Sequence, residues 1–307
     1  MKVDIKSVID KTKGEKVEGS VYVSSFVYKT SKNGELFVRG CVRDQKLVIG
    51  FTVWSENVEA FREAFAASKI LTVLGVVDVW QDMPSIVFKS VKADVYGYKA
   101  TDFLFGYNKK QLDSDFYEFL EHVNPRVRQL VDKLVEGELK ERFFTEFAAN
   151  KMHDACPGGL AGHTIKMLRL AKTVVDNDKR LLPYSELIYV GVICHDIGKI
   201  REYYMGDYAK NGFVSHIDYG CEMLYSIKDF VVDLFDEVFF YHLISIIRGH
   251  HHIYGDRAKT VYAYIIHLID MIDSQTTMFL DNLDTHNYKE TSNGEKITIH
   301  NNEVFYY

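Results

Sequence analysis

The chain has 307 residues, of which 47% are hydrophobic and 26% are charged, an ordinary composition for a soluble protein with one or two buried cores. The net charge of −6 argues against a protein that simply coats nucleic acid. Residues 1–100 carry 15 Lys and Arg against 12 Asp and Glu, so the remainder carries a net charge of −9. This uneven distribution suits a binding module joined to a metal-holding module.

The four cysteines are widely spaced and include no CxxC pair, so the sequence indicates neither a disulfide framework nor a thiolate zinc site. No apolar run approaches the roughly 20 residues that cross a bilayer. The first residues lack the apolar region of a signal peptide. We therefore expect a cytoplasmic protein without a membrane partner.

Residues 15–93 are rich in β-branched and aromatic residues and are predicted to form short strands. Asn33-Gly34 is a hairpin signal between the first two strands. A short amphipathic helix that carries Phe61 and Phe65 on one stripe precedes the last two strands. Three strands, a helix and two strands are the element order of a five-stranded OB barrel, so we expect an OB-like β-barrel here.

One face of the second predicted strand carries an aromatic ring beside cations. Alternation along that strand places Phe37, Arg39 and Arg43 on the same side. OB folds hold single-stranded nucleic acid with such stacking surfaces and neighbouring cations. The nucleic-acid contacts expected on this basis are Lys32, Phe37, Arg39, Arg43 and Trp54. The alternative interpretation is that Phe37 and Trp54 belong to the barrel core and that the arginines are ordinary solvated charges.

In the second half of the chain, hydrophobic residues recur with the period of an α-helix instead. The period begins at Ser114 and is interrupted at Pro125, at Gly137 and at residues 157–159. The predicted helices span residues 115–123, 126–136, 138–152, 160–175, 184–199, 216–231, 236–251 and 258–282.

These patterns predict an α+β fold class with two domains. The expected parts are an OB-like nucleic-acid-binding domain (1–93), a linker (94–112), an all-α domain (113–283) and a C-terminal tail (284–307). The tail is polar, and we expect a small hairpin in it around Asn301-Asn302.

The run from Leu187 to Lys199 is the most informative segment of the all-α domain. Eight apolar or small residues lead directly into His195-Asp196, and Lys199 follows within one helical turn. An imidazole and a carboxylate are costly to bury unless they are paired or bound to a metal. Adjacent side chains on a helix diverge by about 100°, but both can still contact one ion that lies between them. The pair therefore predicts a metal site, provided that other segments supply further ligands.

Other predicted helices offer residues of the same kind. Asp270 lies among apolar residues, where a surface charge is not expected. Nitrogen and oxygen ligands without sulfur favour Mn, Fe, Co, Ni or Zn over calcium. Enough ligands exist for two ions, and a pair of ions about 3.5–4 Å apart suits phosphoester hydrolysis. The candidate ligands are His163, His195, Asp196, His216, His250, His251, His252 and Asp270.

The order H…HD…D resembles the HD phosphohydrolase superfamily. The runs GGLAGHTIKMLRLA, GVICHDIGK, GHH and IIHLIDMID, preceded by an OB-like module, resemble the YhaM-type 3′-to-5′ exoribonucleases. The resemblance covers residues 15–283 and makes 113–283 an HD domain. It implies a hydrolase that trims single-stranded RNA, with DNA as a second substrate, from the 3′ end. It also implies one or two divalent ions, with Mn²⁺ first and Co²⁺, Fe²⁺, Ni²⁺ or Zn²⁺ as alternatives.

The resemblance assigns the first ion to His163, His195, Asp196 and Asp270. Asp196 would bridge to a second ion. Lys199 would contact a phosphate oxygen, so Asp196 and Lys199 are the expected catalytic residues. The alternative interpretation is that Lys199 stabilises a helix C-terminus as a cation.

The second ion would be held by His216 and His250, with His251 as the competing choice. The sequence departs from the family pattern at one position. The family has a histidine one to two turns before the histidine pair, whereas Ser245 stands there in this chain and His242 is displaced by three residues.

Several of these residues also have a simpler interpretation. His163 can cap a helix, His216 can be a solvated helix start, and residues 250–252 can form a hydrated loop. His153-Asp154 is a second His-Asp pair, but it follows an amphipathic segment and lacks the apolar surroundings of His195-Asp196. At most we expect this pair to support the ligands or to face a phosphate.

Two other functions remain compatible with the sequence. One is an HD-domain nucleotide or cyclic-nucleotide phosphohydrolase with the OB module as a regulator. The other is a non-catalytic single-strand-binding protein with a structural metal site. The acidic, tyrosine-rich second half is also compatible with a homo-oligomer.

Overall fold

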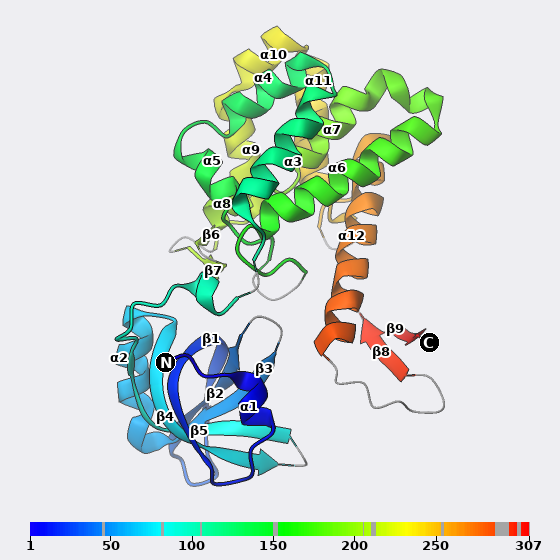
Figure 1. Ribbon diagram of the computed structural model, residues 1–307. Coiled ribbons are helices and arrows are strands. Elements are labelled where there is room, and N and C mark those ends of the chain that lie inside the picture. The colour runs from blue at the N-terminus through cyan, green and yellow to red at the C-terminus, as the bar shows by residue number, and fades with distance from the viewer. Residues whose placement is uncertain are drawn as a thin grey trace. The chain divides into compact units, whose positions relative to one another are not determined.

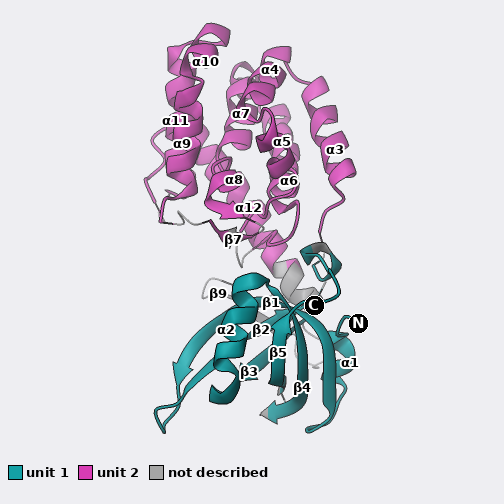
Figure 2. Cartoon of the chain, turned by 90° about the vertical axis from the view of Figure 1, so that its left-hand side faces the viewer, with its two compact units in different colours: residues 1–105 teal, residues 106–307 magenta. Residues whose placement is uncertain are grey.

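The computed structural model describes residues 1–307 apart from 45–46, 81–82, 105, 150–152, 205, 210–212, 253–254, 286–294, 300–301 and 307. The chain forms two compact units, Met1–Phe105 and Gly106–Tyr307 (Figure 2). The boundary between them falls inside the expected linker 94–112. Among the described residues, no helix combines the length and the apolar character needed to span a membrane.

The first unit is a closed barrel with the strand order β1-β2-β3-β5-β4 (Figure 1). β1 pairs antiparallel with both β2 and β4, and the parallel pair β3–β5 closes the ring. The predicted OB-like barrel is confirmed, and with it the α+β fold class. The elements of this unit are α1 (Ile5–Ile9), β1 (Lys16–Thr30), β2 (Leu36–Arg43), β3 (Val48–Val53), η1 (Ser55–Asn57), α2 (Val58–Ala67), β4 (Ile70–Trp80), β5 (Met83–Ala93) and η2 (Ala100–Asp102).

The barrel interior is filled by alternate residues of its strands. Val38 and Val42 of β2 are fully buried, and burying each aliphatic side chain contributes roughly 1.5–3 kcal/mol. Phe51 of β3 and Phe88 of β5 stack with their ring centroids 4.6 Å apart. Gly40 is required where β1 and β2 approach closely, because a Cβ there would lie 2.3 Å from the carbonyl oxygen of Ser25. This packing leaves the odd-numbered side chains of β2 outside the core.

The second unit is mainly helical, and its core lies between α6, α7, α11 and α12 (Figure 1). α7 is buried from Leu187 to Cys194 because it is apolar all round. The elements of this unit are α3 (Lys109–Glu121), α4 (Pro125–Leu134), α5 (Glu138–Phe143), α6 (Gly159–Asn177), η3 (Lys179–Tyr184), α7 (Ser185–Cys194), α8 (Lys199–Glu202), β6 (Tyr203–Tyr204), β7 (Asp207–Tyr208), α9 (His216–Ser226), α10 (Lys228–Leu234), α11 (Glu237–Gly249), α12 (Val261–Thr285), β8 (Glu295–Ile299) and β9 (Asn302–Tyr306).

Some predicted helix bounds were wrong. α3 starts at Lys109, earlier than expected, because the Asn108 side chain caps it. The helix predicted over 138–152 ends at Phe143. The one predicted over 216–231 is divided at Ile227 into α9 and α10. The helix predicted over 184–199 ends at Cys194, so the central His-Asp pair lies in a turn.

The C-terminal tail contains an antiparallel pair of strands, β8 and β9. Ile299 pairs with Asn302 at the end of this ladder. Asn301, at which the hairpin was expected to turn, lies outside the described residues.

Candidate metal centre

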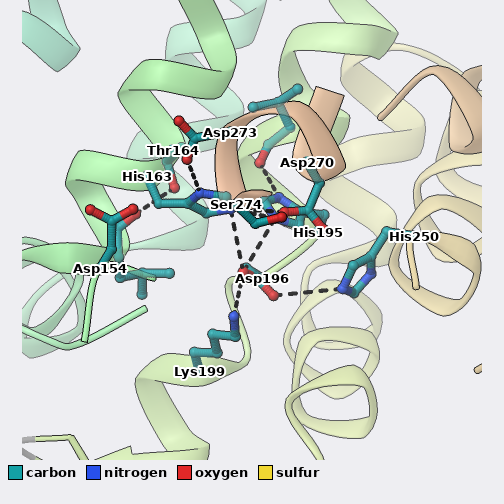
Figure 3. Close-up of polar contacts among 12 residues, drawn as sticks. Asp154, His163, Thr164, His195, Asp196, Lys199, His250, Asp270, Asp273 and Ser274 are labelled. Carbon is teal, nitrogen blue, oxygen red and sulfur yellow. Dashed lines mark hydrogen bonds and ion pairs between the residues drawn. The ribbon is translucent and has the colours of Figure 1, made fainter. Parts of the chain in front are cut away.

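Helices α6 and α12 bring an imidazole and two carboxylates together (Figure 3). The His163 side chain, near the start of α6, is fully buried. Its Nε2 lies 3.4 Å from Asp270 Oδ1, and its Nδ1 lies 2.7 Å from Asp273 Oδ2. Asp270 and Asp273 are three residues apart on α12, so both carboxylates lie on the face that meets α6.

The turn between α7 and α8 adds His195 and Asp196 to the same place (Figure 3). His195 Nε2 lies 3.4 Å from His163 Nε2 and 3.2 Å from Asp196 Oδ2. Asp196 Oδ2 in turn lies 3.8 Å from His163 Nε2. The structure therefore assembles the residues expected for a first ion, and we call them the first cluster: His163, His195, Asp196 and Asp270.

The other oxygen of Asp196 faces a second set of histidines. Asp196 Oδ1 lies 3.6 Å from His216 Nε2 and 3.6 Å from His250 Nε2. His216 Nε2 also lies 3.0 Å from His251 Nε2. We call His216, His250 and His251 the second cluster. Because it contains both members of the histidine pair, the structure does not force a choice between His250 and His251.

Two atoms at the centre of this arrangement are buried without a hydrogen-bond partner in the described part of the chain. They are Asp196 Oδ1 and His250 Nε2. Nearly all buried polar atoms in proteins are paired, because an unpaired one costs about 1–3 kcal/mol. A cation between these two atoms would satisfy both. The residues present therefore fit a divalent metal ion bound by nitrogen and oxygen ligands.

Four histidines of the two clusters also share one hydrogen-bonding pattern. In each, Nδ1 lies within hydrogen-bonding distance of an oxygen atom, so a proton on Nδ1 leaves the Nε2 lone pair directed at the centre. This is how metal-binding histidines are usually oriented. The pairs are His163 with Asp273, His195 with the carbonyl of Val192, His216 with Glu202 and His250 with the carbonyl of Ile247.

Lys199 lies against the shared carboxylate. Its Nζ donates to Asp196 Oδ2 at 2.6 Å, and the side chain is almost fully buried. Burial alone would raise the pKa of the Asp196 carboxyl, but Lys199 and His195 outweigh burial and hold that pKa well below its usual value. Asp196 is therefore ionised and available as a ligand at neutral pH. Lys199 opens α8 instead of ending α7, so it is not placed as a C-terminal cation of the central helix.

Comparison with known proteins identifies the family of the domain that contains these clusters. The HD domain family model matches residues 160–275. This second unit contains an HD domain. The chain is 28% identical over 199 residues to the 3′-5′ exoribonuclease YhaM of Oceanobacillus iheyensis, covering 62% of this chain and 61% of that protein.

Other relatives match over more of the chain. The 3′-5′ exoribonuclease YhaM of Listeria monocytogenes serotype 4b is 24% identical over 285 residues, or 89% of this chain and 90% of that protein. The protein of the same name in Bacillus subtilis is 26% identical over 278 residues, or 86% and 87%. The predicted resemblance to the YhaM-type proteins is confirmed. No solved structure gave a significant match.

The remaining histidines of the HD domain lie in different surroundings. The His242 ring packs against Tyr262, with ring centroids 5.2 Å apart, and His242 is in none of the candidate metal clusters among the described residues. His252 contacts His267, whose Nδ1 donates to the His250 carbonyl at 2.7 Å. His267 thus helps to fix the backbone of the histidine pair.

The sequence analysis missed several residues that hold the clusters in place. Asp273 and Glu202 orient two ligands, and Lys166 contacts Asp273 Oδ2 at 3.2 Å. The available signal was spacing, since Asp273 lies three residues after Asp270 and Lys166 lies three residues after His163.

The second His-Asp pair is more deeply buried than expected. Asp154 is only 5% exposed. Lys166 donates to its Oδ2 at 2.8 Å, and the Tyr107 hydroxyl donates to its Oδ1. The expectation that this pair lacks burial was wrong because the tight turn before α6 folds it back onto the helix. A Cβ at Gly159 would lie 1.9 Å from the Asp154 carbonyl oxygen, which explains the glycine at that position.

In the first unit, the expected nucleic-acid contacts lie outside the barrel core. Trp54 is 43% exposed, and its ring lies 5.3 Å from the half-buried ring of Phe37. The alternative that these two rings belong to the core was therefore wrong. Lys32 and Arg39 are exposed, whereas Arg43 is half-buried and its Nε has no hydrogen-bond partner in the described part of the unit.

Proposed function

We propose that the chain is a metal-dependent phosphodiesterase that removes nucleotides from the 3′ end of single-stranded RNA, with single-stranded DNA as a second substrate. The observation that carries the proposal concerns two buried atoms of the HD domain, Asp196 Oδ1 and His250 Nε2, which have no hydrogen-bond partner among the described residues. The names of the relatives supply the reaction class and its direction.

The ligand residues would divide between two ions. The first cluster would hold one ion and the second cluster the other, with Asp196 shared because its two oxygens face different clusters. The ligands, nitrogen and oxygen without sulfur, suit Mn²⁺, Fe²⁺, Co²⁺, Ni²⁺ and Zn²⁺. We propose Mn²⁺ because it is the ion that the family resemblance implies first. When bound, two such ions supply Lewis acidity and lower the pKa of coordinated water.

The protein's own groups would keep the ligands preorganised. Lys199 holds the Asp196 carboxylate through its 2.6 Å contact and balances part of its charge. Asp273 and Glu202 fix the rings of His163 and His216 with Nε2 turned inward. Side chains held in this way need little rearrangement when a phosphate enters the site.

The barrel would hold the substrate strand. Phe37 and Trp54 present neighbouring rings at the surface, on which unpaired bases can stack. Lys32, Arg39 and Arg43 would contact the phosphates. This role favours single strands over duplexes, because only unpaired bases expose their faces.

The test is incubation of the purified full chain with 5′-labelled single-stranded RNA and DNA, with Mn²⁺ or with a chelator. We expect a ladder of products shortened by one nucleotide at a time, only in the presence of Mn²⁺. Hydrolysis of mononucleotides with intact oligomers would favour the nucleotide phosphohydrolase instead. A protein that binds Mn²⁺ but turns over none of these substrates would favour the single-strand-binding protein.

A further inference from the structure

His153 lies beside the first cluster, outside the residues that the sequence analysis assigned to the two ions. Its ring centroid is 5.1 Å from that of His163. Its Nε2 is buried and has no hydrogen-bond partner in the described part of the chain. Like Asp196 Oδ1 and His250 Nε2, this nitrogen is a buried polar atom that lacks a hydrogen bond among the described residues.

The geometry of this group suits a common ion. One ligand atom each from His153, His163 and Asp270 lies within 4.8 Å of the others. His163 Nδ1 already faces Asp273, so Nε2 is the atom that His163 can offer. The same His163 Nε2 also faces His195 and Asp196. His153 thus approaches the first cluster at its His163–Asp270 edge.

The neighbouring residue explains how His153 is kept there. Asp154 adopts a left-handed backbone conformation with φ 52°, which is unusual for a residue other than glycine. Its carbonyl oxygen accepts hydrogen bonds from the backbone N–H groups of Ala148 and Cys156 at 3.2 and 2.8 Å. Its carboxylate is held by Lys166 and Tyr107. The turn is therefore fixed by contacts of Asp154, and His153 Nε2 has no hydrogen-bond partner among the described residues.

We propose that His153 is an additional ligand of the first ion, next to His163 and Asp270. The inference rests on the proposed metal-dependent function and extends its ligand set by one imidazole. An imidazole nitrogen is a ligand that Mn²⁺, Fe²⁺, Co²⁺ and Zn²⁺ all accept. The assignment also gives a partner to a buried nitrogen that would otherwise be left unpaired at a cost.

The experiment is titration of the metal-free full chain with Mn²⁺ in a calorimeter. We expect His153→Ala to lower the affinity of one class of site by about tenfold or more and to leave the other class unchanged. His242→Ala is the matched control, since that histidine lies against Tyr262 and should leave both affinities at the wild-type value. Thermal unfolding of the metal-free variants reports whether each is folded.

A second variant keeps the test decisive if His153→Ala fails to fold. In His153→Gln the side-chain amide can still offer an oxygen, so its affinity should lie between those of the wild type and of an alanine variant. Wild-type affinity in either folded variant would overturn the assignment and leave the proposed function standing. A wild-type chain that binds no Mn²⁺ would instead overturn both.

Discussion

The second unit contains two His-Asp pairs, both of which contact His163, and the pairs differ in how their carboxylates are paired. Asp196 of the pair 195–196 has one oxygen on Lys199 and another with no hydrogen-bond partner in the described part of the chain. Asp154 of the pair 153–154 has both oxygens paired with protein donors. Both carboxylates are buried, so burial does not distinguish them. What distinguishes a ligand from a structural group is an oxygen that the protein leaves unpaired.

The largest expected effect is at Asp196, the carboxylate with one oxygen free of hydrogen bonds among the described residues. Asp196→Asn should lower the rate of RNA shortening by at least about 10³-fold, because the shared ligand of both clusters loses its charge. The gel ladder measures cleavage, and fluorescence anisotropy should give unchanged RNA binding. Full cleavage by a folded Asp196→Asn chain would refute the metal assignment.

A smaller effect is expected at the residue that orients His163. Asp273→Asn removes the charged partner of Nδ1 and should lower Mn²⁺ affinity roughly 10- to 100-fold. Calorimetric titration measures the change, with His242→Ala as the control. An affinity equal to that of the wild type would mean that the protein does not need Asp273 to orient His163.

The fully paired carboxylate should matter for stability instead. Asp154→Asn weakens the contact with Lys166, whose side chain is 31% exposed, and we expect a loss of about 2 kcal/mol in the free energy of unfolding. Urea unfolding of the metal-free chain measures it. Asp154→Asn could instead abolish cleavage as fully as Asp196→Asn without any loss of stability. That result would refute the assignment of Asp154 as a structural group and not a ligand.

The smallest effect concerns the first unit. Phe37→Ala should weaken single-stranded RNA binding by about 1 kcal/mol or more, since one stacking surface is lost. Anisotropy measured in the Asp196→Asn background avoids cleavage during the titration. Arg62→Ala, on the outer face of α2 in an ion pair with Glu59, is a suitable control. Equal affinities would place the strand elsewhere on the chain.

The metal site and the barrel could be predicted from the sequence because residue type and hydrophobic pattern indicated the same structure there. The apolar run of α7 leads into a histidine and an aspartate, and these polar groups are costly to bury unless they are paired or bound to a metal. The succession of three strands, a helix and two strands followed from turn signals and from alternation, as at Val38 and Val42. Spacing could not tell which polar residues of a helix face inward. The sequence analysis therefore assigned no function to Lys166 or Glu202, which the structure places beside the clusters.

Other features depend on backbone geometry that no local pattern encodes. Tyr107 lies in a segment expected to be a linker, and its contact with Asp154 exists only because the turn before α6 folds back. The inward placement of His153 depends on the left-handed conformation of its neighbour. Similarly, the exposure of Trp54 follows from its position just after β3, where the barrel wall ends.

The carboxylate of Asp196 lies between the two clusters, with Oδ2 toward the first and Oδ1 toward the second. If cleavage requires an ion in each cluster, activity follows the product of the two occupancies and rises more steeply than the occupancy of either site. A plot of activity against Mn²⁺ concentration should therefore have a Hill coefficient above one. The enzyme would then respond to Mn²⁺ concentration as a threshold, remaining inactive while the ion is scarce and becoming active within a narrow range of concentration.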